Sequence, residues 1–244
     1  MSATQYSDGD AATIAYDIQA QFEVTRGRWD GCTRVQLAAC WYYECPPGSA
    51  PYLPSVPLVD GGALSLATSG VAAKQINVGL LYDFLYEAVA VGQLWSASDQ
   101  LLTFSGTGST AGQTPAFALT VQSPPIVTLQ TLDGQPAAPV GMSVTRSQGA
   151  QVHWSTSGSG VARFTILAFE GKSFAAECDF DASAQSGVMS PEILLRFEPG
   201  RNFRVLIRGL SSAHSEVQGW ALEGGLAGYG GPLSAFDPAA LELR

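Results

Sequence analysis

The most regular pattern of hydrophobic and polar positions lies in residues 14–24, where every second residue is apolar. Polar residues such as Asp17, Gln19 and Glu23 occupy the positions between them. Successive side chains of a β-strand point to opposite faces of the sheet, so this period predicts a strand with one buried and one solvated face.

Similar short runs continue along the chain, and Gly, Pro, Ser or Asn separates nearly all of them. The further predicted strands are residues 34–43, 64–68, 100–105, 116–122, 126–132, 142–146, 151–155, 162–170, 174–181 and 203–209. Many short strands with regular turn signals are typical of antiparallel sandwiches or barrels rather than α/β folds. We therefore expect an all-β protein.

Helical signals are few. Ser190 and Pro191 have the residue types of an N-cap and a first helical position, and Glu192 follows, so one short helix is predicted here. Residues 80–91 fit both a helical face and a strand alternation, and the neighbouring β signals favour a strand.

The best candidate for a domain boundary is Ser123-Pro124-Pro125. Two consecutive prolines favour extended geometry and cannot donate hydrogen bonds to a central ladder. We expect two consecutive antiparallel β-sandwich-like modules, Ig-like or jelly-roll-like, at 1–123 and 124–223. Residues 224–244 are expected to be a flexible glycine-rich connection and a C-terminal segment.

Charged residues make up only 14% of the 244 residues, and the formal net charge is −9. Nucleic acids and anionic membranes both attract clustered cations, so neither is an expected partner. Residues 100–132 contain no charged residue. Prolines and many Ser, Thr and Gln residues interrupt this stretch, whereas a membrane-spanning helix needs about 20 apolar residues. We expect no transmembrane segment.

Three of the four cysteines, Cys32, Cys40 and Cys45, lie close together, and Cys178 stands alone far downstream. Their spacing differs from the paired cysteines of zinc sites. It favours a disulfide among Cys32, Cys40 and Cys45 over free buried thiols, and both over a metal site. Cys178 is expected to be a small buried hydrophobic residue.

A disulfide indicates an oxidising compartment. The first residues lack the basic and apolar regions of a signal peptide. We expect an extracytoplasmic protein, on the outer surface or secreted, whose native signal segment is absent from this chain. A cytoplasmic location is the alternative.

A series of short motifs follows the clustered cysteines. They are residues 94–106 (LWSASDQLLTFSG), 115–117 (PAF), 123–125 (SPP), 146–147 (RS), 152–154 (VHW), 178–182 (CDFDA), 187–190 (GVMS) and 194–195 (LL). This order of motifs resembles uncharacterised, predicted surface lipoproteins of myxobacteria. The resemblance implies an exported two-part β protein, and it implies no assigned activity or functional residues.

The sequence shows no arrangement typical of an enzyme. A nucleophile needs a neighbouring base, but the only histidines, His153 and His214, have no acid motif nearby. The Gly171-Lys172-Ser173 triplet lacks the upstream glycine of a phosphate-binding loop, because that position is Ile166. We therefore expect a non-catalytic protein.

Three acids, Glu177, Asp179 and Asp181, alternate with apolar residues and would share one face of a strand. Calcium favours such clustered oxygen ligands, so these residues are a candidate calcium site. The alternative is a polar strand face whose acids pair with Arg163 or Arg204. No other cofactor is expected.

The aromatic residues Trp41, Tyr42 and Tyr43 precede a proline-rich loop that contains Tyr52. A strand buries only alternate side chains, so at least one ring of the trio should face outwards. These four residues are the candidate ligand-binding residues. They fit either a protein contact or the stacking of a sugar ring.

The favoured function is a binding or assembly protein that acts through a protein–protein surface and that could form a homo-oligomer. The alternative is a carbohydrate-binding module that uses the exposed aromatics near Trp41.

Overall fold

The computed structural model describes residues 2–7, 14–20, 32–45, 60–69, 75–82, 85–91, 94–95, 98–112, 114–168, 173–230 and 239–244. These residues are almost entirely β-structure, which confirms the predicted all-β class. In this part of the chain, no helix is both long and apolar enough to cross a membrane.

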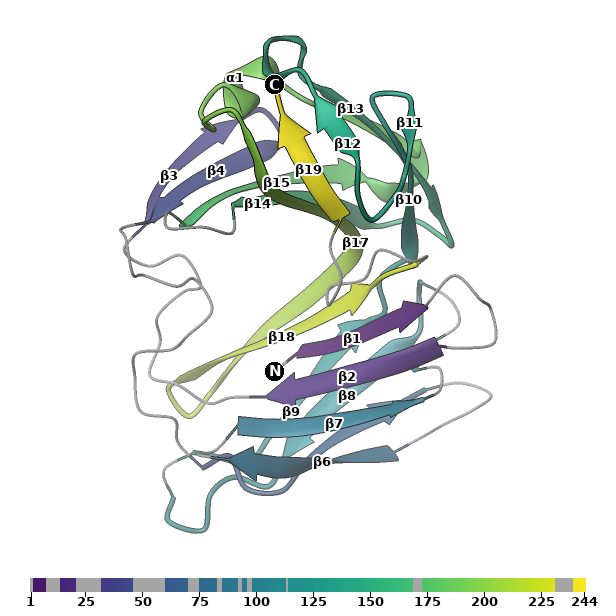
Figure 1. Cartoon of the computed structure of the whole chain (residues 1–244). Coiled ribbons are helices and arrows are strands. Elements are labelled where there is room, and N and C mark those ends of the chain that lie inside the picture. Colours follow the sequence, from purple (N-terminus) through teal and green to yellow (C-terminus); the bar gives the residue numbers. More distant parts are fainter. Residues whose placement is uncertain are drawn as a thin grey trace.

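Two lobes share one long strand, β17 (Gly200–Val217), which runs from the upper lobe into the lower one (Figure 1). The other strands of the upper lobe are β3 (Thr33–Leu37), β4 (Cys40–Cys45), β10 (Val127–Leu132), β11 (Gln135–Pro136), β12 (Met142–Val144), β13 (Ala150–Thr156), β14 (Val161–Ala168), β15 (Ser173–Asp181), β16 (Ser186–Met189) and β19 (Ala239–Leu243). The lower lobe contains β1 (Ser2–Ser7), β2 (Ile14–Ala20), β5 (Leu64–Thr68), β6 (Gln75–Tyr82), β7 (Leu85–Val91), β8 (Leu101–Gly106), β9 (Phe117–Gln122) and β18 (Trp220–Gly228).

One 15-stranded sheet connects both lobes, in the order β3-β4-β15-β14-β17-β18-β1-β2-β7-β6-β5-β8-β9, with β12 and β19 joined to it at β17. A second, four-stranded sheet has the order β11-β10-β13-β16. Most pairs are antiparallel, whereas β1 pairs with β18 and β12 with β19 in parallel. The large sheet serves two cores because β17 pairs with β14 in its first half and with β18 in its second.

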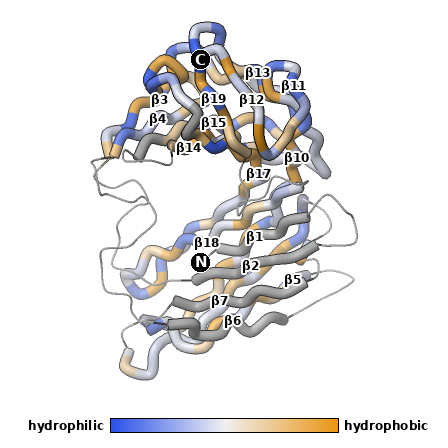
Figure 2. The backbone as a smooth tube through the Cα atoms, viewed as in Figure 1, coloured by the Kyte–Doolittle hydropathy of each residue, from blue (hydrophilic) through white to orange (hydrophobic). Residues whose placement is uncertain are grey.

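The core of the upper lobe lies between the four-stranded sheet and the large sheet. Its inward side chains come from alternate positions of the strands, and Figure 2 shows hydrophobic and hydrophilic stretches alternating along this lobe. Trp154 is 2% exposed, stacks on Phe180 at 5.6 Å between ring centroids, and donates from Nε1 to the Ala182 carbonyl at 2.8 Å. A buried indole therefore has both its apolar contact and its hydrogen-bond partner.

The lower core is built by alternate residues of β5, β8 and β9, including Leu66, Phe104 and Leu119, which pack against Leu226 of β18. Gly224 allows these two layers to approach closely, because a Cβ atom there would lie 2.7 Å from Leu119 Cδ2. The close packing of β18 on β9 therefore depends on a residue without a side chain.

Several local predictions agree with the structure. Residues 64–68 form β5, and a short helix, α1 (Pro191–Leu194), follows Ser190. The described residues within 80–91 are strand rather than helix, and they belong to two strands, β6 and β7. The predicted run 34–43 is also two strands, because the chain turns at Ala38, whose φ is +52°.

The flexible connection predicted near the C-terminus was wrong over residues 224–228. Residues 224–228 are not a flexible connection but the end of β18, which is hydrogen-bonded to both β17 and β1. The glycines reflect close packing: a Cβ atom on Gly228 would lie 2.6 Å from the carbonyl oxygen of Pro125. The C-terminal residues return to the upper lobe as β19.

The order of the chain differs from the order of the strands in space. Hairpin β3–β4, which the sequence assigns to the first module, is hydrogen-bonded to β15 of the second. This pairing brings the cysteine- and aromatic-rich hairpin beside the strand that carries Glu177 and Asp179.

Candidate functional site

All four cysteines form disulfides, Cys32–Cys45 and Cys40–Cys178. The first bond confirms the predicted disulfide within the N-terminal cluster. The second corrects the prediction for Cys178, which is buried but is bonded to its register partner on β4. Because Cys40 and Cys178 have a sequence separation of 138, no local sequence pattern identifies Cys40 as the partner of Cys178. Two disulfides indicate an oxidising, extracytoplasmic environment.

The aromatic trio is divided between the two faces of β4. Tyr42 points into the upper core, where its ring meets Phe197 edge-on at 5.3 Å and its hydroxyl donates to the Arg196 carbonyl at 3.3 Å. Burial is the main cause that raises the pKa of Tyr42 to about 12, Glu44 adds to it, and Arg196 opposes it. This placement removes Tyr42 from the surface.

Trp41 and Tyr43 lie on the opposite face of β4. Tyr43 is buried, and Trp41 is partly exposed with the Arg34 guanidinium 4.6 Å from the centroid of its ring. Trp41 is therefore the member of the trio with an accessible surface, and its ring already has a cationic neighbour. Tyr52 lies outside the described residues.

Glu177 and Asp179 share the face of Trp41, since Glu177 is the register partner of Trp41. We call this side of β4, β15, β14 and β17 the polar face. Two sites that the sequence analysis treated separately, the aromatic trio and the acids, therefore meet on one sheet.

Arginines from the next two strands engage the acids of the polar face. Arg163 donates to both carboxylate oxygens of Asp179, at 2.6 and 2.7 Å, and to Glu177 at 3.2 Å. Arg208 lies 3.8 Å from Glu177 and donates to the hydroxyl of Tyr229 at 3.2 Å. The hypothesis that Arg163 pairs with these acids is confirmed.

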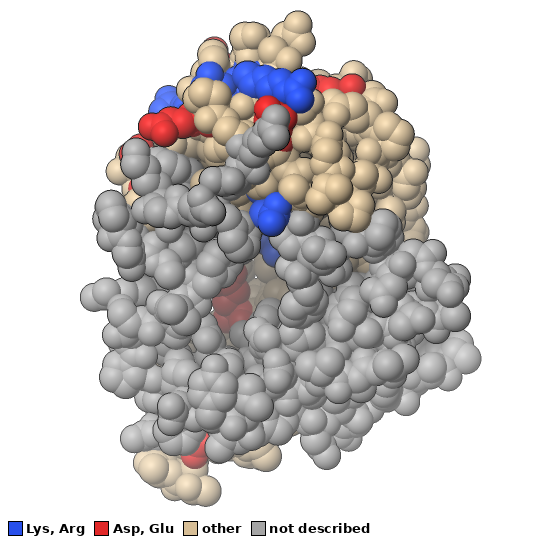
Figure 3. All heavy atoms as spheres, viewed as in Figure 1, with Lys and Arg blue, Asp and Glu red and all other residues tan. Residues whose placement is uncertain are grey.

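The described ion pairs of the polar face form one connected network. The guanidinium groups of Arg163 and Arg208 lie against the carboxylates of Glu177 and Asp179, and Glu177 is only 3% exposed. The hydrogen bond to Asp179 is the main cause that raises the pKa of Arg163. Burial, and then Glu177, raise the pKa of Tyr43. Figure 3 shows basic and acidic atoms close together on the surface of the upper lobe.

The third acid of the candidate calcium site is engaged elsewhere. Asp181 accepts hydrogen bonds from the backbone N–H and hydroxyl of Ser183, which lower its pKa. Across the described ranges, no group of three or more His, Cys, Asp or Glu residues is placed to hold a metal ion. The arrangement of these three acids therefore gives the calcium hypothesis no support.

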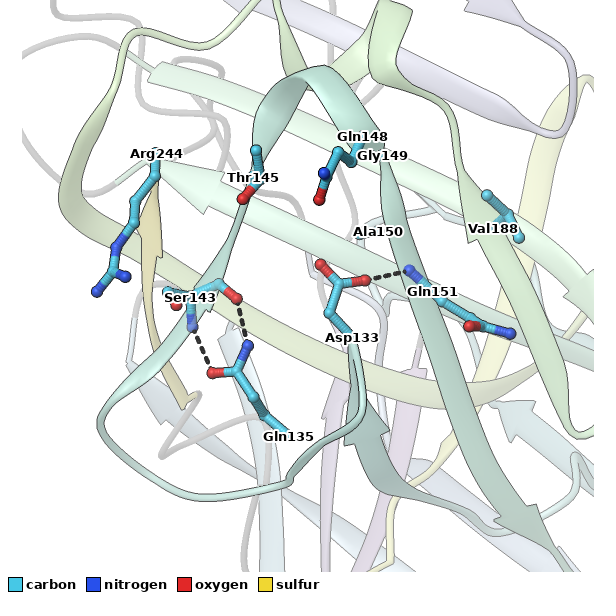
Figure 4. A pocket seen from close by; sticks show the side chains of 10 residues that line it. All are labelled: Asp133, Gln135, Ser143, Thr145, Gln148, Gly149, Ala150, Gln151, Val188 and Arg244. Carbon is cyan, nitrogen blue, oxygen red and sulfur yellow. Dashed lines mark hydrogen bonds between the residues drawn. The ribbon is translucent and has the colours of Figure 1, made fainter.

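A shallow depression of about 650 Å³ opens on the upper lobe beside the β10–β11 hairpin (Figure 4). It is lined by Asp133, Gln135, Ser143, Thr145, Gln148, Gly149, Ala150, Gln151, Val188 and Arg244. Gln135 is fixed by two hydrogen bonds to the backbone of Ser143, at 2.6 and 3.1 Å, and Asp133 accepts from the Gln151 N–H at 2.7 Å. The depression thus presents amide and hydroxyl groups on a rigid backbone.

A second surface lies on the solvent side of β5, β8 and β9. We call it the outer face; its described side chains are Ser65, Ala67, Leu101, Thr103, Ser105, Ala118, Thr120 and Gln122, all partly or fully exposed. None of them is charged. Neighbouring hydroxyls pair across the strands, Ser65 with Ser105 at 2.9 Å and Thr103 with Thr120 at 3.0 Å.

The sequence contained one signal for the outer face, the charge-free stretch 100–132. Sequence reasoning used this stretch only to exclude a membrane span. The structure shows that its alternate residues build a continuous surface on β8 and β9.

No protein-family model matches this chain, and no curated protein matches it.

Proposed function

We propose that the chain is a non-catalytic extracytoplasmic binding or assembly protein that acts through a protein–protein surface, the outer face. The observation that carries the proposal is the absence of charge from every described side chain of this face, in a protein of net charge −9. The centres of protein interfaces are depleted of charged residues, because a buried charge without a partner is costly.

Two further observations support the proposal. The two disulfides fit an extracytoplasmic location, as does the resemblance to predicted surface lipoproteins. Glu177 and Asp179 of the polar face are paired with arginines, which suits a structural role for that network better than acid–base chemistry.

Site-directed photo-crosslinking tests this proposal. A photoreactive residue at Thr120 should give protein adducts of defined mass in the surface extract of producing cells, and Thr103→Lys should abolish them. The same photoreactive residue at Ala184, an exposed site on the upper lobe, is the control. If position 120 gives no adduct beyond those of position 184, the proposed function is wrong.

The depression favours a second candidate function, carbohydrate binding. Its amide and hydroxyl side chains, such as Gln148 and Thr145, can exchange hydrogen bonds with sugar hydroxyls. A glycan array tests this candidate. Saturable binding that Gln148→Ala abolishes supports the depression, binding that Trp41→Ala abolishes supports the aromatic hairpin, and uniform silence removes both.

A further inference from the structure

The strongest evidence for a specific partner lies on the outer face. We infer that its partner is a second copy of this chain, packed face to face about a two-fold axis; this inference rests on the proposed function. Charge, hydrogen-bonding chemistry and shape each favour this partner.

The first argument is charge. Two copies that each carry −9 repel one another wherever their contacting surfaces are acidic. The outer face has no described charge, and residues 100–132, which supply most of it, contain none in the sequence. Contact through this face therefore adds no close like-charge pair, and it offers a charged partner nothing with which to pair.

The second argument is hydrogen-bonding chemistry. A two-fold axis places a surface against itself, so every group must suit an identical group. Hydroxyls meet this condition because each is both donor and acceptor, and an amide group meets it because its NH₂ donates and its oxygen accepts. The protein already shows such pairing between identical side chains, in Thr103 with Thr120 and in Ser65 with Ser105.

The third argument is shape. Small side chains, among them Ala67, Ala118 and Ser65, leave the pleated surface low, so a second sheet can approach to the usual distance of about 10 Å. Leu101, which is 52% exposed, is a large apolar side chain at the edge of this surface and would be covered by the second copy.

The area of the outer face determines how strong the proposed dimer is expected to be. Three strands about 4.8 Å apart, with about 20 Å of length each, cover roughly 300 Å². Stable interfaces bury about 800 Å² on each partner. The dimer should therefore be weak, with a dissociation constant between about 10 μM and about 1 mM.

Sedimentation equilibrium tests the inference on the purified, disulfide-bonded chain across that concentration range. The wild type should shift from monomer to dimer. Thr120→Lys and Thr120→Asp should each raise the dissociation constant at least about tenfold, since each places like charges at the contact. An equimolar mixture of the two variants should recover dimers, because the charges are then opposite.

Ala184→Lys adds the same charge as Thr120→Lys outside the outer face and should dimerise like the wild type. Near-ultraviolet circular dichroism of each variant verifies the native fold. A wild type that stays monomeric throughout overturns self-association, as do single variants that dimerise like the wild type, or a mixture that stays monomeric. If Thr120 then still cross-links to a different protein, the proposed function stands and only the identity of the partner was wrong.

Discussion

Glu177 is a buried carboxylate whose near neighbours on the polar face are two guanidinium groups. Arg163 lies 3.2 Å and Arg208 3.8 Å from its oxygens. Removing one member of a buried ion pair costs more than the pair contributes, because the remaining charge stays desolvated. The network is therefore sensitive to the loss of its acid.

We predict that Glu177→Gln lowers the free energy of unfolding by about 2–3 kcal/mol, because it leaves two partly buried arginines with less compensation. Urea unfolding at neutral pH measures this change. Glu216→Gln on β17 removes an equal charge from an exposed position and should change stability by less than about 0.5 kcal/mol. Equal effects of the two substitutions would contradict a structural role for the network.

Tyr42 gives a prediction that depends on pH. Its pKa is raised to about 12 in the folded protein, from about 10 in an unfolded chain. A raised folded pKa means that the stability contributed by the neutral phenol is complete below about pH 10 and is lost as the pH rises towards about 12. The wild type should therefore lose stability more steeply than Tyr42→Phe in this range.

The same variant should already be weaker at neutral pH, by about 0.5–1.5 kcal/mol, because the hydroxyl no longer donates to the Arg196 carbonyl. Urea unfolding at about pH 8 and about pH 11 separates the two effects. Parallel losses of stability in both proteins would show that Tyr42 does not report the alkaline transition.

At the scale of residues, the sequence allowed the pairing of the acids with Arg163 to be predicted, but not the contact with Arg208. Glu177, Asp179 and Arg163 lie on strands that are consecutive in the chain, so their pairing was open to prediction. Arg208 joins them only because β17 pairs with β14. Alternation along one strand shows which side chains share a face, but it does not identify the neighbouring strand.

At the scale of elements, the glycines of β18 offer a matched test of close packing. A Cβ atom at Gly228 would lie 2.6 Å from the backbone oxygen of Pro125, whereas one at Gly225 has nothing within 4 Å. Gly228→Ala should destabilise the protein by about 1–3 kcal/mol, because backbone must move. Gly225→Ala, on the same strand, should be neutral within about 0.5 kcal/mol. Thermal unfolding compares them, and similar losses would refute the packing argument.

The two disulfides should differ in their contribution to stability. In the chain-entropy model, a bond across a sequence separation of 138 restricts the unfolded chain more than one across 13. Replacing the pair Cys40 and Cys178 by Ala should cost about 5 kcal/mol, against about 3 kcal/mol for Cys32 and Cys45. Guanidinium unfolding of the two double variants tests the order, which would be reversed if the short loop contributes more.

The strands themselves were largely predictable, and their pairing was not. Residues 64–68 form a strand because their alternation matches a half-buried ladder. The glycines of residues 224–228 led to the prediction of a flexible loop where the structure has a strand. Glycine occurs both in loops and at close contacts between sheets. Which of these applies depends on Leu119 and Pro125, which are distant in sequence.

At the scale of the whole molecule, the net charge of −9 predicts an unusual response to salt. Added salt screens the repulsion between two acidic copies, so self-association through an uncharged face should strengthen as ionic strength rises. An interface built on ion pairs would weaken instead. Sedimentation equilibrium at about 0.05 M and about 0.5 M NaCl distinguishes them, and dimers that dissociate in salt would exclude the outer face.

Strands that are far apart in the chain pair in the sheet, since Ser2 is the register partner of Gly225 and Cys40 that of Cys178. A ribosome releases the first strand long before it makes β18, so β1 must wait for its parallel partner. The large sheet can therefore be completed only after β18 has been made. The Cys40–Cys178 disulfide, which joins β4 to β15, likewise can form only after β15 has been made.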